Sequence, residues 1–354
     1  MLEVHRPPLD DIDWPALDAF GDRMFSQRRH WLEFIAAFTD GEVVVAELHR
    51  GAEVVGYFSG IRFRRCGIPI LGSPFRGWTT PYMGFNLASG VSRIEALRAV
   101  EQFAFRELGC LHLEVTDRQF TVEDGAALGF AHRLVRTLVT DLTQDEDLLL
   151  ANMSSACRRA IRKAEKSGVV VEPADPAGFA EEYGAQLQDV FAKQDLRPTY
   201  SHTRVQKLID HVFPSGDLLL ARVRDPEGRC IATGIFPGFN HFSFFWGNGS
   251  LREHQILRPN EALHWFAMRY WKQRGMRQHD WGGANAYKEK YGVVPYTTVA
   301  LRRSRYAMLQ HARDLAERLY YFPRELRRRR YDAKVMGARA AAEDGVPAAS
   351  RGSS

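Results

Sequence analysis

The sequence contains few cysteines and no long apolar run. Its 354 residues include four cysteines, Cys66, Cys110, Cys157 and Cys230, and no two of them have CxxC spacing. The pattern therefore excludes a zinc knuckle and gives no sign of a disulfide framework. No apolar stretch approaches the roughly 18 residues that span a bilayer, and residues 1–13 lack the apolar core of a signal peptide. We expect reduced thiols and a cytoplasmic protein.

Several catalytic signatures are also missing. The sequence has no GxSxG elbow, no Walker loop and no HExxH motif. Its 12 histidines include no pair at metal-binding spacing beside a cysteine or a carboxylate set. The segment Gly247-Asn248-Gly249 is typical of a turn and does not match a nucleotide fingerprint. The sequence therefore predicts no metal site.

The composition is that of a globular protein with locally concentrated positive charge. Hydrophobic residues make up 45% and charged residues 26%, which excludes a collagen, a coiled-coil rod and a wholly disordered chain. The formal charge is 48 − 43 = +5, but basic residues cluster at 158–166 and again from Arg302 to Arg330. Such clusters bind phosphates, nucleic acid or anionic membranes, and they also occur on solvated helix faces. Charge alone leaves these alternatives open.

Hydrophobic periodicity indicates mixed α/β structure in both halves of the chain. In the first half, residues 42–63 read as a β-hairpin, 68–90 as an ordered loop rich in glycine, proline and aromatics, 92–108 as a helix and 111–115 as a strand. The second half shows helices at 153–167, 176–194, 202–212 and from 259 to a glycine stop at 275, with strands at 169–172, 218–223, 230–236, 242–246, 277–281 and 297–303. Two successive α/β units of mixed, largely antiparallel sheet flanked by helices suggest a duplicated architecture.

Two segments resemble FemAB-like transferases. They are MSSACRRAIRKAEKSGVVV at Met153–Val171 and RPNEALHWFAMRYWKQRGMRQHDWGGANAYKEKY at Arg258–Tyr291, in which a Pro-Asn helix start leads to a strand ending in Asp, a glycine pair and a Tyr-Lys step. The resemblance implies tandem domains of the GNAT acyltransferase superfamily. Its best-known members move an amino acid from aminoacyl-tRNA onto an amine of a peptidoglycan precursor, and a CelD-like sister branch is usually acyl-CoA dependent. It covers about Met153–Tyr306 closely and the first half only in architecture.

Composition and the resemblance together suggest a division of the chain into four parts. These are an N-terminal GNAT-like domain at 1–147, a C-terminal GNAT-like domain carrying the family motifs at 148–306, a basic C-terminal helix at 307–332 and a disordered tail at 333–354. The shift to an acidic, polar composition at Asp141–Asp147 marks the boundary between the first two.

One departure from the GNAT pattern concerns the acyl donor. GNAT acetyltransferases hold the CoA pyrophosphate with a glycine-rich loop, because glycines let consecutive backbone N–H groups approach the phosphates at a helix N-terminus. The corresponding stretch here reads SLREHQILRPNEAL, with no glycine after Gly249. This favours aminoacyl-tRNA as donor, with acyl-CoA as a close alternative.

The candidate catalytic residues are Lys288 and Asp280. Lys288 occupies the lysine of the family's Tyr-Lys step, where a fixed cation would stabilise an oxyanion or hold a donor phosphate. The alternative is a surface lysine beside Glu289. Asp280 ends a strand before a glycine pair, where it would accept a proton from the attacking ammonium or merely cap the next turn.

The remaining candidates are binding residues, and each has a structural alternative. Donor-binding roles are assigned to Tyr287, Asn260, Arg258, Gly282 and Gly283. Phosphate or acceptor binding is assigned to Arg158, Arg159, Arg162, Trp78 and Tyr82. The alternatives are a core tyrosine, helix initiation at Arg258, a solvated helix face and a packed loop around Trp78 and Tyr82.

The sequence thus predicts an acyltransferase that joins an aminoacyl or acyl group to an amine of a cell-envelope or glycan precursor. The acyl donor would be a co-substrate, with no tightly bound cofactor. An acyl-CoA-dependent N-acetyltransferase and a non-catalytic anion or nucleic-acid binding protein are the alternatives. The expected partners are the acyl donor, an amine-bearing envelope precursor, tRNA, and a membrane surface contacted through the arginines at 324–330. That contact would place the protein at the inner face of the membrane.

Overall fold

The computed structural model describes residues 2–192, 200–316, 319 and 322. Met1–Arg303 forms one compact unit, and a second unit begins at Ser304, where residues 307–316 are helical. The predicted basic helix at 307–332 is therefore described mainly in its first part. The arginines at 324 and 327–330, and the predicted tail at 333–354, lie outside the described residues.

The first unit contains nine numbered α-helices and fourteen strands within the described residues. The helices are α1 (Trp14–Asp18), α2 (Arg29–Thr39), α3 (Arg93–Gln102), α4 (Val122–Ala127), α5 (Glu146–Asn152), α6 (Ser155–Lys166), α7 (Phe179–Ala192), α8 (His202–Val212) and α9 (Pro259–Gln273). The strands are β1 (Glu3–His5), β2 (Glu42–Arg50), β3 (Glu53–Arg65), β4 (Ile68–Ser73), β5 (Gly84–Leu87), β6 (His112–Asp117), β7 (Ala131–Asp141), β8 (Val170–Pro173), β9 (Leu218–Arg224), β10 (Cys230–Phe239), β11 (Phe242–Phe244), β12 (Gly247–Ser250), β13 (Gln278–Asp280) and β14 (Val294–Ser304). Two short 3₁₀ helices, η5 (Arg252–Leu257) and η6 (Ala286–Tyr291), flank α9 and β13 in the sequence.

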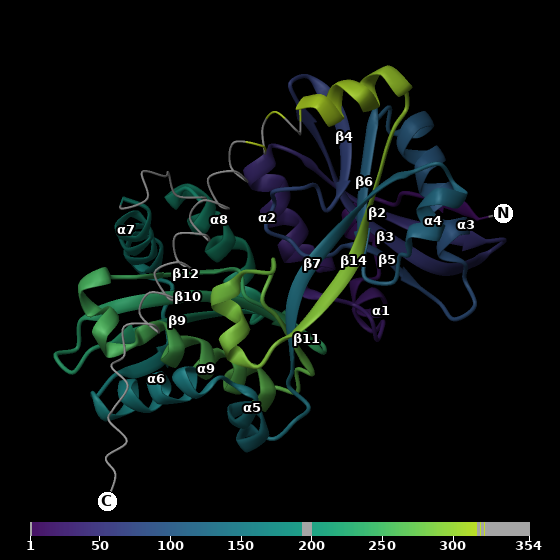
Figure 1. Cartoon of the computed structure of the whole chain (residues 1–354). Coiled ribbons are helices and arrows are strands. Elements are labelled where there is room, and N and C mark those ends of the chain that lie inside the picture. Colours follow the sequence, from purple (N-terminus) through teal and green to yellow (C-terminus); the bar gives the residue numbers. More distant parts are fainter. Residues whose placement is uncertain (1, 193–199, 317–318, 320–321, 323–354) are drawn as a thin grey trace, which may run out of the picture. The chain divides into compact units, whose positions relative to one another are not determined.

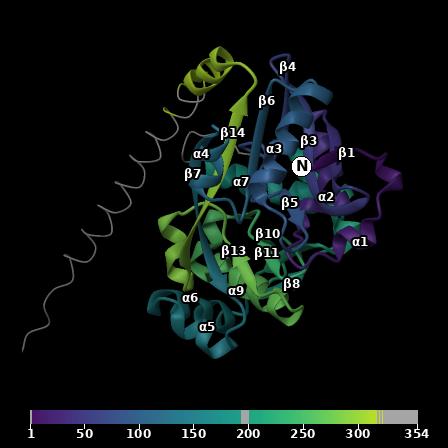
Figure 2. The same cartoon turned by 90° about the vertical axis from the view of Figure 1, so that its right-hand side faces the viewer.

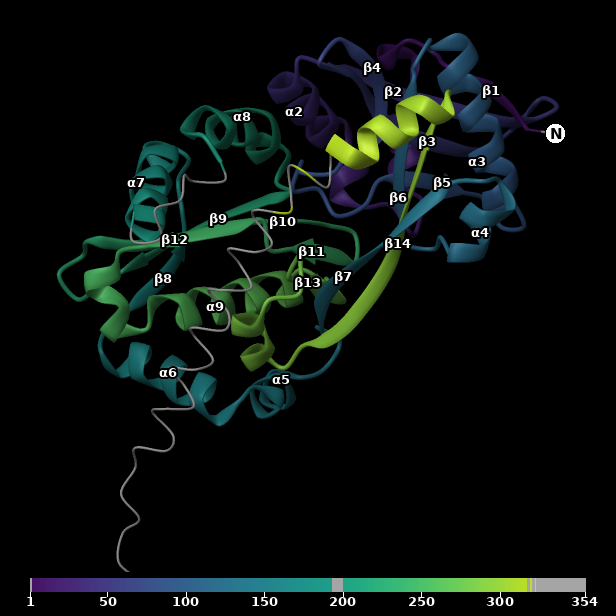
Figure 3. The same ribbon diagram turned by 45° about the horizontal axis from the view of Figure 1, so that its top comes forward.

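The strands form one continuous sheet. Its order is β1-β2-β3-β4-β6-β14-β7-β13-β11-β10-β9-β8, with β5 on β3 and β12 on β10. Most neighbouring pairs are antiparallel, and the parallel pairs are β4 with β6 and β11 with β13. The long strands β7 and β14 run side by side between the two halves (Figure 3). The predicted mixed α/β fold, with a largely antiparallel sheet flanked by helices, is confirmed.

Three hydrophobic clusters hold the helices on the sheet. Alternate residues of β2 point to opposite faces, so that Val44 packs toward α3 while Val43 and Val45 pack toward α2. The cluster under α2 also includes buried residues of α7 and α8, and the third cluster joins α6 and α9 to β9 and β10. Figures 1 and 2 show α6 and α9 together on one side of the second-half strands, and Figure 1 shows α7 and α8 on the other.

The parallel strands β11 and β13 separate at their ends. They remain paired as far as Phe244 and Asp280, and Phe245 N still donates to Asp280 O at 2.8 Å. The chain then leaves β13, because β12 pairs with β10 instead, with Gly247 opposite Ile235. The strand predicted at 242–246 is therefore confirmed over Phe242–Phe244, and it ends before Phe245 and Trp246. This divergence opens space beside the end of β13.

The structure also corrects the sequence-based assignment of other elements. The stretch at 68–90 was expected to be a loop, but it contains β4 and β5. The long strand β7 was not predicted, and its partners β13 and β14 lie far away in the sequence. The predicted boundary at 147/148 falls inside α5. Because both halves contribute strands to one sheet, the domain division stays a prediction.

Candidate active site

A cavity of about 600 Å³ lies where β11 and β13 diverge. Its wall includes the end of β13 and the loop after it (Asp280–Gly283), Tyr287 and Lys288 of η6, and the loop from Pro74 to Tyr82. Thr137 of β7 and a group of aromatic side chains complete it. Residues from both halves of the chain therefore meet around the motif Asp-Trp-Gly-Gly.

Asp280 is a buried carboxylate of this wall that accepts three hydrogen bonds. It is 1% exposed, and its Oδ2 accepts a hydrogen bond from the Tyr82 hydroxyl at 2.9 Å. Its Oδ1 accepts from the Thr137 hydroxyl and from Gly282 N, the latter at 2.7 Å. Burial raises the pKa of Asp280 above its ordinary value, although these three hydrogen bonds favour the ionised form and oppose the rise. A buried carboxylate with a raised pKa is suited to accepting a proton.

Lys288 holds the loop that follows Asp280. Its ammonium group donates to the backbone carbonyls of Trp281 and Gly282, and to that of Gly283 at 3.3 Å. The side chain is 5% exposed, and Nζ lies 5.1 Å from the centre of the Phe245 ring. Gly282 and Gly283 have φ of +56° and +45°, a conformation that favours glycine. The lysine therefore fixes the turn whose N–H group reaches Asp280.

Aromatic side chains form the wall next to β12. Tyr200 stacks on Trp246 with ring centres 4.3 Å apart, and Arg204 lies over both rings. The Tyr183 hydroxyl and the Trp246 indole N–H are buried and have no hydrogen-bond partner among the described residues. Gly247 is required beside them, because a Cβ there would lie 2.5 Å from the Tyr183 hydroxyl. The wall thus presents polar hydrogens that a ligand can use.

The candidates at the start of α9 lie beside the cavity. Arg258 precedes the helix with φ of +62°, and Pro259 occupies its first position. The Asn260 side chain accepts a hydrogen bond from Asn248 Nδ2 at 2.8 Å, and Asn248 is part of the cavity wall. The structure therefore connects Asn260 to the wall through Asn248 and places Arg258 outside it.

The remaining candidates are not brought into the cavity. Trp78 packs against Phe63 and Phe75, whereas Tyr82 of the same loop does line the cavity. Arg158 donates to the carbonyls of Ala151 and Met153 at the end of α5. Arg159 and Arg162 are exposed on α6.

Sequence analysis missed several residues of the wall. Thr137 was overlooked because β7 was not recognised, although the alternation in HRLVRTLVTDL is typical of a strand. Tyr183, Tyr200 and Trp246 lie in helical, loop and strand-end segments whose meeting depends on the sheet order. No local signal identifies these three residues.

Comparisons with known proteins agree with this geometry. Residues 151–291 match the model of the acetyltransferase (GNAT) domain. These residues form a GNAT acyltransferase domain, and the tandem GNAT fold that the FemAB resemblance implied is confirmed. No protein with a curated description matches its sequence.

Three solved structures share the fold at low sequence identity. A structure of FemX has a TM-score of 0.70 and 15% identity, with 84% of this chain and 96% of that chain covered. The C-terminal domain of a putative lysylphosphatidylglycerol synthetase from Agrobacterium fabrum has a TM-score of 0.53 and 12% identity, with 81% of this chain and 91% of that chain covered. A tandem GNAT protein from the clavulanic acid biosynthesis pathway has a TM-score of 0.52 and 12% identity, with 86% of this chain and 98% of that chain covered. The likeness over most of each chain establishes a FemX-like tandem GNAT fold.

Membrane-spanning helices and clusters of metal-ligating side chains are both absent from the described residues. None of the helices described is long and apolar enough to cross a membrane. Within the same residues, no group of three or more His, Cys, Asp and Glu side chains could hold a metal ion.

Proposed function

We propose that this acyltransferase moves an aminoacyl group from aminoacyl-tRNA onto an amine of a cell-envelope or glycan precursor. The proposal is carried by the buried carboxylate of Asp280, which ends β13 at the point where the GNAT strands diverge and lines a cavity built by both halves. The FemAB resemblance supplies the class of substrates, and Asp280 supplies the proton acceptor.

The start of α9 favours a donor other than acyl-CoA. A CoA pyrophosphate needs several free backbone N–H groups at a helix N-terminus. Pro259 has no N–H, and Glu261 in the same turn places a carboxylate there, paired with Lys290 at 2.6 Å. The preceding 3₁₀ helix η5 occupies the stretch where the glycine loop would lie. The segment offers little to a diphosphate.

Asp280 accounts for the movement of the proton. The acceptor amine attacks the carbonyl carbon of the aminoacyl ester, so that an N–C bond forms and, after a tetrahedral intermediate, the ester C–O bond breaks. The Asp280 carboxylate takes the proton that the attacking nitrogen loses and returns it to the departing ribose oxygen. We assign the proton transfer to Oδ2, because this oxygen accepts only the Tyr82 hydrogen bond among the described residues.

The aromatic wall supplies donors for the intermediate. A tetrahedral oxyanion is stabilised by preorganised hydrogen-bond donors in a site that excludes water. The Tyr183 hydroxyl and the Trp246 indole N–H are buried, have no partner in the described part of the chain and belong to residues of the cavity wall. We assign Lys288 to positioning, since its ammonium group is engaged with three backbone carbonyls.

The exposed face of α6 is the proposed contact for tRNA phosphates. Arg159, Arg162, Lys163 and Lys166 are exposed on it, whereas Cys157, Ala160, Ile161 and Ala164 are buried. Lysine and arginine side chains on one helix face bind a polyanion in a salt-dependent way, because each phosphate contact releases counterions.

We expect titration of the purified protein to distinguish the donors. Aminoacyl-tRNA should bind saturably, with an affinity that falls steeply between low and high salt, and acetyl-CoA should give no saturable signal. Saturable binding of acetyl-CoA, together with no detectable binding of aminoacyl-tRNA, would reject aminoacyl-tRNA as the donor and indicate an acyl-CoA-dependent enzyme.

A pair of double variants tests the α6 surface in the same titration. Arg159→Gln/Arg162→Gln should weaken tRNA binding several-fold and reduce the slope of log affinity against log salt by about 2, one unit per lost phosphate contact. Arg98→Gln/Arg106→Gln removes the same charge from exposed positions near α3 and should leave the slope unchanged. Equal slopes for the two double variants would contradict the assignment.

Tyr82→Phe should move the pH dependence of acyl transfer. The Tyr82 hydroxyl donates to the ionised form of Asp280, so its loss raises the pKa of Asp280 further. A hydrogen bond to a charged group contributes about 1.5–3 kcal/mol, and 1.36 kcal/mol corresponds to about one pKa unit. We expect the acidic limb of kcat/KM to shift upward by about one pH unit. Tyr57→Phe, a buried tyrosine outside the cavity wall, is the control, and an identical profile for both variants would argue against Asp280 as the titrating base.

A further inference from the structure

A second cavity, of about 490 Å³, lies next to the reaction cavity. The two share strands: Phe242 and Gln278 line the second cavity, and Phe244 and Asp280, two residues further along β11 and β13, line the first. Side chains two apart on a strand point to the same face, so both cavities open on one face of this pair. Tyr82 stands between them, with its hydroxyl on Asp280 and its ring 5.6 Å from the Arg118 guanidinium.

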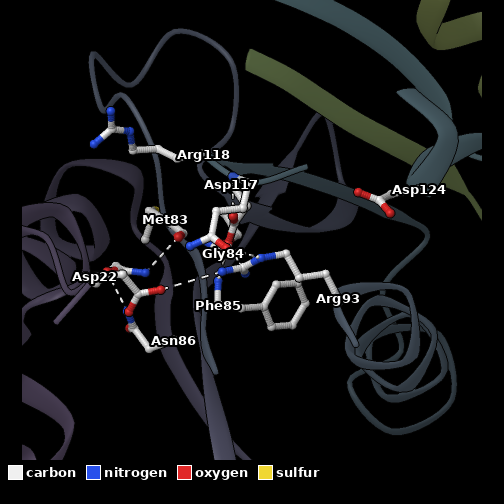
Figure 4. A network of polar contacts seen from close by, with 12 residues as sticks. Asp22, Met83, Gly84, Phe85, Asn86, Arg93, Asp117, Arg118 and Asp124 are labelled. Atoms are coloured by element: carbon white, nitrogen blue, oxygen red, sulfur yellow. Dashed lines mark hydrogen bonds and ion pairs between the residues drawn. The ribbon is translucent and has the colours of Figure 1, made fainter. Parts of the chain in front are cut away.

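The second cavity is lined by three carboxylates, Asp22, Asp117 and Asp141, and each already has donors. Asp141 accepts from Thr143 N at 2.9 Å and from the Thr143 hydroxyl at 2.7 Å. Asp117 accepts from Arg93 at 3.1 Å and from the backbone N–H groups of Phe85 and Gln119. Asp22 accepts from Asn86 Nδ2 at 2.9 Å and lies 3.6 Å from Arg93. Figure 4 shows Arg93 reaching into this network and the Arg118 side chain extending away from it. These acids therefore do not need Arg118.

Arg118 forms no ion pair among the described residues, although its charge opposes the rise in the pKa of Asp280. Its guanidinium lies 5.0 Å from the Phe242 ring centre and 5.1 Å from that of Tyr296, and it donates to Gln278 Oε1 at 2.7 Å. Its Nε is buried and has no hydrogen-bond partner within the residues that the structure describes. A fixed, partly desolvated guanidinium with a spare donor is suited to an anion.

A second arginine of the same cavity, Arg277, also has unused hydrogen-bond donors. Arg277, next to Gln278, is exposed, and its side chain has no hydrogen bond or ion pair within the described part of the chain. By contrast, Arg23 of this cavity donates to Asp18, Asn86 and the Gln27 carbonyl. The unused donors are thus concentrated on the β13 side, beside the apolar surfaces of Phe242 and Tyr296.

We propose that this cavity binds a small organic anion, a carboxylate or a phosphate monoester, with its charged group on Arg118 and Arg277 and its apolar part against Phe242 and Tyr296. The volume is that of a site for a small molecule rather than for an inorganic ion alone. The proposal does not depend on the identity of the acyl donor.

Binding of three matched probes to the full chain tests this site. Benzoate and phenyl phosphate carry the two anionic groups on the same ring, and benzamide is the uncharged counterpart. Calorimetry should show saturable binding of benzoate, phenyl phosphate or both, and at least tenfold weaker binding of benzamide. The tighter of the two anions identifies the ligand's charged group, and absence of saturable binding for both would overturn the proposal.

Two substitutions and one control locate the binding. Arg118→Gln should weaken the anion about tenfold or more, and the exposed Arg277→Gln, which removes no buried contact, should weaken it several-fold. Arg274→Gln removes an exposed arginine outside both cavities and should leave the affinity unchanged. If Arg118→Gln fails to fold, Arg277→Gln decides alone. Anion affinity that neither variant changes would overturn the proposal.

Discussion

Asp280→Asn should reduce the turnover of acyl transfer by about 10²- to 10⁴-fold, the range that a general base contributes. Asparagine preserves the shape of the side chain: its oxygen can accept from Gly282 N and Thr137, and its Nδ2 can donate to the Tyr82 oxygen. We therefore expect a folded protein. The measurement is kcat under saturating donor and acceptor, together with the thermal unfolding midpoint.

The pKa of Asp280 sets the sign of two further effects of this substitution. Burial raises this pKa, so that on acidification Asp280 becomes protonated at a higher pH than an ordinary aspartate, whose pKa is about 4. The protonated form is not a base, and wild-type activity should therefore begin to fall while the pH is still above about 4. A group whose pKa is raised by folding also lowers stability once pH exceeds its unfolded-state pKa. Asp280→Asn should therefore leave the thermal midpoint at neutral pH unchanged or slightly higher.

A buried aspartate outside the cavity provides the matched control. Asp217 lies at the start of β9, where burial raises its pKa to about 6 and Arg28 is 3.2 Å away. Asp217→Asn removes a comparable buried carboxylate without touching the cavity wall, so it should keep kcat within about twofold. Equal losses in Asp280→Asn and Asp217→Asn, or full activity in Asp280→Asn, would remove Asp280 from the reaction.

Local signals predicted the elements whose ends and faces are specified by their own residues. The pattern around α9, with Pro259 near the start, Glu261 in the first turn and Gly275 after the end, gave a helix that the structure places at Pro259–Gln273. The hairpin of β2 and β3 was predicted because its turn and both alternating strands are adjacent in the sequence. These elements need little information from distant parts of the chain.

Features that depend on distant pairing were missed. The strand β4 is short and contains Pro69, so its glycine- and proline-rich surroundings resemble a loop, but pairing with β3 and β6 stabilises it as a strand. Asp280 was predicted from its place before two glycines, whereas its partners Tyr82 and Thr137 are 198 and 143 residues away. The sequence indicated the candidate carboxylate, but it contained no local pattern for the hydroxyl groups that hold it.

The role that the sequence suggested for Lys288 also differs from the contacts that Lys288 makes in the structure. Its place in the Tyr-Lys step suggested a cation that stabilises an oxyanion or holds a phosphate. In the structure its ammonium group faces the carbonyls of Trp281, Gly282 and Gly283. These contacts are the basis of our proposal that Lys288 is a positioning residue, which would affect the reaction through the turn it fixes.

Lys288→Met should lower kcat by about tenfold or more and move the pH profile. Methionine keeps the apolar stem beside Phe245 but leaves three carbonyls without their donor, at a cost of about 1–3 kcal/mol for a buried unsatisfied group. The released turn no longer holds Gly282 N on Asp280, so the pKa of Asp280 rises and the acidic limb of kcat/KM shifts upward. KM for the acceptor should change less than kcat.

A partly buried lysine, Lys272, separates positioning from a loss of stability. Lys272 donates to the carbonyls of Leu142 and Gln144 at 3.0 and 2.6 Å, away from the cavity, so Lys272→Met should destabilise the fold without moving the pH profile. Lys288→Arg keeps the charge, but a planar guanidinium does not reproduce three convergent ammonium hydrogen bonds. It should therefore retain part of the shift. A large loss of kcat in Lys288→Met with an unchanged acidic limb would instead indicate direct contact of Lys288 with the oxyanion.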